Sequence, residues 1–117
     1  MIKTKLVIIY TLTLVALSAC GKGSSSTKDG NAAARDIFAA RCAMCHGEDG
    51  EGNPPGGMRA PGLKRQQVLS YTDEQLFERI SNGTRNMPPF KNSLTEAQIK
   101  SLVRFIREEI QGHKPST

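Results

Sequence analysis

Two cysteines and a histidine occur within five residues of one another, in the order Cys42-Ala43-Met44-Cys45-His46. Thiols three positions apart can bond to two vinyl groups on one edge of a porphyrin, and a histidine directly after the second is held against the metal. This C-x-x-C-H spacing is the attachment signature of haem c. We therefore predict that Cys42 and Cys45 bind one haem covalently and that His46 is an axial ligand of its iron.

Two other uses of a C-x-x-C pair fit this chain less well. A structural zinc site needs a second pair of ligands, and the sequence offers only Cys20 and His113 outside the motif. A thioredoxin-like site needs strands that alternate with helices, and no such pattern is apparent. Haem attachment is the favoured interpretation.

The composition suits one small domain that holds a bulky cofactor. The chain has 117 residues, no tryptophan and 5% aromatic residues, so its side chains alone would form a thin core. A buried porphyrin would supply the missing apolar volume. The formal net charge of +5 is modest and scattered, so we expect no nucleic-acid partner.

Residues 1–19 have the three parts of a secretory signal: a basic start, a short apolar run and small residues before a cleavage site. The run is too short for a comfortable transmembrane helix. Leu17-Ser18-Ala19-Cys20 resembles the lipobox of bacterial lipoproteins, which implies cleavage before Cys20 and a diacylglycerol on its sulfur. The alternatives for Cys20 are a free thiol in an uncleaved anchor and an intermolecular disulfide.

The segment 20–31 is rich in glycine and serine and predicts a lipidated flexible linker, followed by a domain over 32–117. Export is consistent with the C-x-x-C-H motif, because haem c is attached outside the cytoplasm in the bacteria that the lipobox implies. We expect an extracytoplasmic protein that is lipid-anchored to a bacterial membrane. Gly21 is not the aspartate that retains lipoproteins at the inner membrane, so the outer face of the cell membrane and the outer membrane are both open.

Hydrophobic spacing predicts helices over 32–41, 72–81 and 95–111. We expect Asn31 or Asp29 to cap the first helix. The other two helices begin with a capping box, in which a threonine is followed three residues later by a glutamine. These pairs are Thr72 with Gln75 and Thr95 with Gln98. The last helix carries an apolar stripe that predicts a core face: Ile99, Leu102, Val103, Ile106 and Ile110, with Phe105 beside it.

Met87 lies between the two later helices and is followed by Pro88 and Pro89, which would stiffen the loop that presents its thioether sulfur. Met44 is inside the attachment turn and cannot reach the opposite face of a haem. Met58 is the rival, in a glycine-rich loop without the flanking prolines. Simple core packing is the other interpretation of Met87 or Met58.

Residues 33–111 resemble the class I cytochrome c family, of the short bacterial type. The resemblance rests on C-x-x-C-H-G followed by Gly50 and Gly52, and on the segment Met87-Pro88-Pro89-Phe90. It implies an all-α fold, the small cytochrome c fold, with three to four helices around one covalently attached haem.

The same resemblance implies roles for individual residues. His46 and Met87 would be the two axial ligands, the Pro61 carbonyl would accept a hydrogen bond from the imidazole, and Leu63 would pack near the porphyrin. The sequence departs from the family at Ala34, where glycine is usual, and at Phe105, where tyrosine or tryptophan is common.

Two filled axial positions leave no open site for a substrate, so we expect an electron carrier and not an enzyme. It would pass single electrons between respiratory partners, such as a quinol-oxidising complex and a terminal oxidase. One alternative is a haem-based sensor or ligand-binding protein. Another is the electron-entry subunit of a larger oxidase or reductase. No group of acids, bases or nucleophiles near the motif suggests catalysis by this chain alone.

Overall fold

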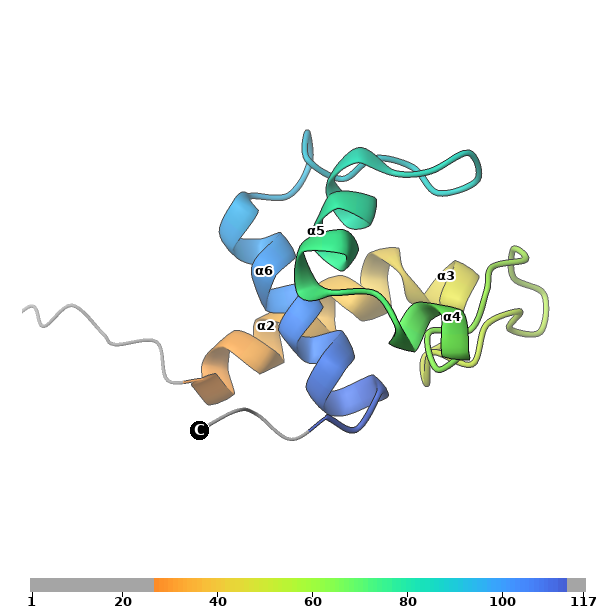
Figure 1. Cartoon of the computed structure of the whole chain (residues 1–117), viewed down its shortest axis with the longest axis horizontal. Coiled ribbons are helices and arrows are strands. Elements are labelled where there is room, and N and C mark those ends of the chain that lie inside the picture. Colours follow the sequence, from red (N-terminus) through yellow and green to blue (C-terminus); the bar gives the residue numbers. More distant parts are fainter. Residues whose placement is uncertain (1–26, 114–117) are drawn as a thin grey trace, which may run out of the picture.

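The computed structural model of the chain describes residues 27–113 (Figure 1). The predicted secretory signal, Cys20 and most of the predicted linker lie outside these residues. The elements are α2 (Thr27–Arg41), α3 (Ala43–His46), α4 (Gln66–Leu69), α5 (Asp73–Asn82), α6 (Glu96–Phe105) and η1 (Ile106–Ile110). The described residues form no strand, only one isolated bridge between Thr84 and Met87. The predicted all-α fold is confirmed.

The centre of the fold is the crossing of α2 and α6 (Figure 1). Ala34 is completely buried, and its small side chain suits a close approach of two helices. Phe38 on α2 packs against Phe105 on α6 with 5.5 Å between ring centroids and 49° between ring planes. This crossing fixes the direction in which α2 leads the chain into the C-x-x-C-H motif.

Helix α2 begins at Thr27, five residues before the predicted start at Ala32. Residues 27–31, which the sequence analysis assigns to the linker, are therefore helical. Asn31 is not a cap: its side-chain Nδ2 donates a hydrogen bond to Glu108 Oε2 at 2.9 Å, across 77 positions of sequence. This contact with Glu108, far away in sequence, stabilises the first turns of the helix, and local sequence patterns cannot show it.

Both capping boxes form as predicted. The Gln75 backbone N–H donates to Thr72 Oγ1 at 3.2 Å, and the Thr72 N–H donates to Gln75 Oε1 at 2.9 Å. Thr95 and Gln98 make the same two contacts at the start of α6, at 3.2 and 2.8 Å. These pairs satisfy N–H groups that have no partner inside the helix, so they set where α5 and α6 begin.

The predicted apolar stripe of the last helix is buried as expected. Its final turn differs from the expectation, because Ile106–Ile110 is a π-helix and not a continuation of α6. The Gln111 N–H donates to the Ile106 carbonyl at 2.8 Å, which closes this wider turn. The short helix α4 was not predicted.

Within residues 27–113, none of the helices combines the length and the apolar character that crossing a membrane requires.

Candidate functional site

The C-x-x-C-H motif forms a helical turn that continues directly from α2. The Cys42 N–H donates to the Phe38 carbonyl at 2.8 Å, and the His46 N–H donates to the Cys42 carbonyl at 2.9 Å. Cys42 and Cys45 are therefore neighbours one turn apart, as two thioether bonds to a single porphyrin edge require. Both are half-buried, and neither forms a disulfide.

The electrostatics of the motif disfavour the competing thiol chemistry. Burial, and after it the nearby Cys45, raise the pKa of the Cys42 thiol to about 11, and Arg41 opposes the change. A thioredoxin-like nucleophile needs the opposite, a lowered pKa that yields thiolate at neutral pH. The part of the chain from 27 to 113 contains no cluster of three or more His, Cys, Asp or Glu residues that could hold a metal ion.

The ring of His46 is held by a backbone carbonyl from a distant loop. Its Nδ1 lies 3.0 Å from the Pro61 carbonyl oxygen. Because a carbonyl can only accept, this contact assigns the proton to Nδ1 and leaves the lone pair of Nε2 free for a metal. The resemblance implies this carbonyl as the partner of the imidazole, and the structure places the two groups within hydrogen-bond distance.

The two loops that surround His46 are packed backbone to backbone. The Gly52 N–H donates to the His46 carbonyl, and the Leu63 N–H donates to the Gly50 carbonyl, both at 2.6 Å. Gly52 has φ +80°, and a Cβ there would lie 2.6 Å from the Ala60 carbonyl oxygen. Glycine is therefore required at this approach. Leu63 is buried, with 8% of its surface exposed.

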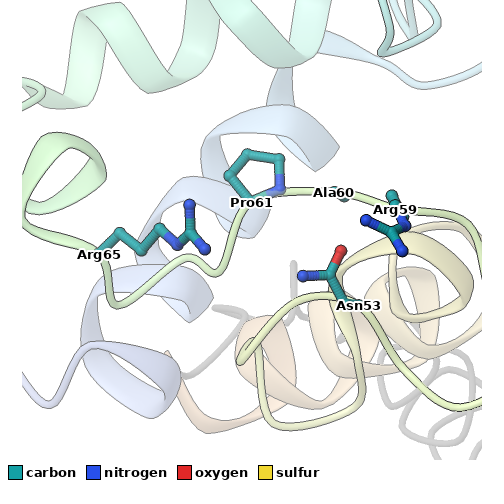
Figure 2. A pocket seen from close by; sticks show the side chains of 5 residues that line it. All are labelled: Asn53, Arg59, Ala60, Pro61 and Arg65. Carbon is teal, nitrogen blue, oxygen red and sulfur yellow. The ribbon is translucent and has the colours of Figure 1, made fainter.

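An open hollow of about 260 Å³ lies on the outer side of this segment, lined by Asn53, Arg59, Ala60, Pro61 and Arg65. Figure 2 shows the two guanidinium groups on either side of Pro61. Neither arginine forms an ion pair with a residue between 27 and 113. The lining is polar and charged, so this is a surface depression beside the His46–Pro61 contact and not an apolar cofactor pocket.

Met87 is presented by a tightly fixed loop. The Thr84 N–H donates to the Met87 carbonyl at 2.9 Å, and the Phe90 N–H donates to the Ile80 carbonyl at 3.1 Å. Gly83 has φ +70°, and a Cβ there would lie 2.8 Å from the Pro88 carbonyl carbon, so a side chain would displace the loop. In Figure 1 this loop extends from α5 toward the same end of the molecule as α3.

The three methionines near the motif or its loops differ in their surroundings. Met87 is half-buried and packs against the hydrophobic core. The side chains of Met44 and Met58 are largely exposed, at 65% and 60%. This difference favours Met87 over Met58 as the residue whose sulfur faces an apolar interior. His113, the other histidine of the chain, is exposed.

A sequence model of the family described as "Cytochrome C oxidase, cbb3-type, subunit III" matches residues 29–106. The chain belongs to this family of c-type cytochromes. Family membership implies covalently bound haem c with its iron, and the matched residues belong to a family of electron carriers of the cytochrome c type. The half-buried thiol pair and the oriented imidazole are a donor set that fits this group.

Individual relatives agree with the family. The cytochrome is 38% identical over 77 residues to the cbb3-type cytochrome c oxidase subunit FixP of Bradyrhizobium sp. (strain ORS 278), which covers 64% of this chain and 26% of FixP. It thus spans about a quarter of that relative. It is 30% identical over 107 residues to cytochrome c6 of Synechococcus sp. (strain ATCC 27167 / PCC 6312), which covers 89% of this chain and 91% of that protein.

A solved structure supports the fold. The KustC0563 c-type cytochrome superimposes with a TM-score of 0.56 at 30% identity, over 70% of this chain and 98% of that one. The predicted class I cytochrome c relationship is therefore confirmed, both in sequence and in structure.

Proposed function

We propose that this cytochrome carries single electrons with one haem c that is bound through Cys42 and Cys45 and ligated by His46 and Met87. The observation that carries the proposal is the 3.0 Å contact between His46 Nδ1 and the Pro61 carbonyl, which leaves Nε2 free to bind the iron. When bound, the haem supplies the ferrous–ferric couple that accepts and donates the electron.

Each residue has a distinct physical role in this proposal. The Pro61 carbonyl orients the imidazole and increases its basicity through the hydrogen bond from Nδ1. The Met87 thioether favours the ferrous state and so raises the reduction potential. The buried side chain of Leu63 would help to exclude water beside His46 and would pack near the porphyrin.

The electron-entry subunit of a larger oxidase is the second candidate function. It is favoured by the matching family description and by FixP, which is itself named as an oxidase subunit. The cytochrome c6 of Synechococcus sp. (strain ATCC 27167 / PCC 6312) is matched over 91% of its length, which favours a separate carrier. Stable co-purification with a large membrane complex would support the subunit, whereas recovery as an individual redox protein would support the carrier.

Carbon monoxide binding tests whether both axial positions are filled. We expect the reduced protein to bind carbon monoxide at least about tenfold more slowly than a Met87→Leu variant, because the thioether occupies the position that the gas needs. The measurement is stopped-flow absorbance after mixing with the gas. Equally rapid binding by both proteins would contradict the carrier and support a haem-based sensor.

We also propose that the protein is exported and held at a bacterial membrane by a lipid on Cys20. The basic, apolar and small-residue parts of segment 1–19 and the lipobox-like Leu17–Cys20 support this proposal. With α2 beginning at Thr27, the tether between lipid and domain is the segment 20–26. Donor and acceptor would then be redox proteins at that membrane, such as a quinol-oxidising complex and a terminal oxidase.

Replacing Cys20 tests the anchor. We expect the wild-type protein to incorporate labelled fatty acid and to sediment with membranes. Cys20→Ala should lose the label while its haem content is unchanged, because it removes only the acylated sulfur. The measurements are fatty-acid labelling and haem absorbance in membrane and soluble fractions of a bacterium that processes lipoproteins. Labelling that persists in Cys20→Ala would contradict the assignment.

A further inference from the structure

The carbonyl that orients His46 belongs to an exposed loop, so water competes for it. Pro61 itself is exposed, and the His46–Pro61 contact joins residues 15 positions apart. A hydrogen bond in such a place persists only if the loop that carries the acceptor is held rigidly. The residues that hold this loop therefore influence the histidine without touching it.

One side of the Pro61 loop is held by the glycine-rich loop that follows the motif. The Leu63 N–H donates to the Gly50 carbonyl at 2.6 Å. The other side is held by the residue that follows the last helical turn, because Gln111 Nε2 donates to the Leu63 carbonyl at 2.9 Å across 48 positions of sequence. Leu63 is thus fixed at both its donor and its acceptor, two residues after Pro61.

Gln111 is itself held by Arg107. The guanidinium Nη1 donates to Gln111 Oε1 at 2.7 Å, so the amide oxygen is occupied and the amide nitrogen is turned toward Leu63. The same guanidinium donates through Nε to Asp73 Oδ1 at 2.8 Å and through Nη2 to the Tyr71 carbonyl. Only 12% of the Arg107 side chain is exposed. A buried arginine with three partners is a rigid support.

The π-helical turn accounts for where these two side chains lie. Gln111 donates its backbone N–H to Ile106, one residue earlier than in an α-helix, and the Arg107 carbonyl accepts instead from the His113 N–H at 2.8 Å. This wider turn changes the direction in which Gln111 points. Single π-turns inside helices are frequent at functional sites.

We propose that Arg107 and Gln111 are positioning residues for the iron ligand, acting through the Leu63 carbonyl on the Pro61 carbonyl and so on His46. The proposal rests on the proposed function, since His46 must be a ligand. Loss of the Gln111 donor lets the Pro61 carbonyl move away from Nδ1. The imidazole would become less basic, a bound ferric iron would lose stabilisation, and the ring would be freer to rotate.

The test uses the full-length, haem-loaded protein with Gln111→Met, which keeps length and volume but removes the donor. Gln67→Met is the matched control, because Gln67 is exposed and its side chain has no hydrogen bond to a residue in 27–113. We expect Gln111→Met to raise the reduction potential, shifting the ferrous-to-ferric ratio by up to about tenfold, and to change the spread of haem-methyl NMR shifts in the ferric protein. These shifts report the orientation of the axial imidazole.

A second variant keeps the test decisive if Gln111→Met does not fold. Gln111→Glu still accepts from Arg107 but cannot donate to Leu63, and Gln67→Glu controls for the added charge. If the Gln111 variants had the same haem-methyl shifts and reduction potential as the Gln67 controls, the positioning role would be overturned, while the proposed function would stand. A wild-type protein without a haem ligated by His46 would overturn the proposed function as well.

Discussion

Replacing Met87 with leucine is expected to lower the reduction potential by about 0.1–0.3 V while the haem stays covalently attached. Axial ligands set haem potentials over a range of roughly 0.8 V, and the loss of a thioether removes preferential stabilisation of the ferrous state. Leucine has a similar volume, so the half-buried position should remain filled. The measurement is a redox titration followed by absorbance.

Met58→Leu is the matched control for this prediction. Met58 is 60% exposed, and its replacement should leave the potential within about 0.02 V of the wild-type value, because it removes no ligand. A large decrease in Met58→Leu with none in Met87→Leu would transfer the ligand assignment to Met58. An unchanged potential in both variants would refute methionine ligation by either residue.

The double variant Cys42→Ala/Cys45→Ala is expected to lose all covalently bound haem. The two thiols are the only groups in the attachment turn that can form thioether bonds, so any haem would be held by ligation alone. The measurement is haem-linked peroxidase staining after denaturing electrophoresis. We expect a fully stained wild-type band and no stained band in the variant.

The Cys20→Ala variant is the matched comparison for this double variant. It should lose the lipid and keep the haem, whereas the double variant should lose the haem and keep the lipid. A stained band in Cys42→Ala/Cys45→Ala would show that the haem is linked elsewhere. Because all three cysteines are then assigned by separate readouts, the chain would have none left for a disulfide.

Features that depend on neighbours in sequence were predictable. The capping boxes of Thr72 and Thr95 operate within four residues, and both form with the partners that the sequence indicates. The apolar stripe of the last helix is buried for the same reason, because its spacing alone defines one face. The C-x-x-C-H motif is equally local, and it led to the family that the comparisons show.

Features that depend on distant contacts were not predictable. The early start of α2 is stabilised by the bond from Asn31 to Glu108, and the support of Leu63 comes from Gln111. A glutamine at the end of an amphipathic helix has no local signal for such a role. The sequence pattern also did not distinguish the π-turn at Ile106–Ile110 from an α-helix, because Ile106 and Ile110 fit the apolar stripe of either.

The assignment of Met87 as a ligand depends partly on its sequence neighbours and partly on distant contacts. The prolines that follow it are a local signal, and Gly83 packs against the backbone of this segment. The sulfur and the imidazole are nevertheless presented by separate elements, so ligation by both stays a prediction. His46 and Pro61, by contrast, lie in direct contact.

In the proposed cytochrome, one covalent haem has histidine and methionine as its axial ligands. An optical spectrum of the purified wild-type protein, oxidised and reduced, before and after denaturation, tests it most directly. We predict a low-spin spectrum with the weak far-red band of methionine-ligated ferric iron, and haem absorbance that stays with the denatured chain. A high-spin spectrum, or haem that separates from the chain on denaturation, would contradict the account.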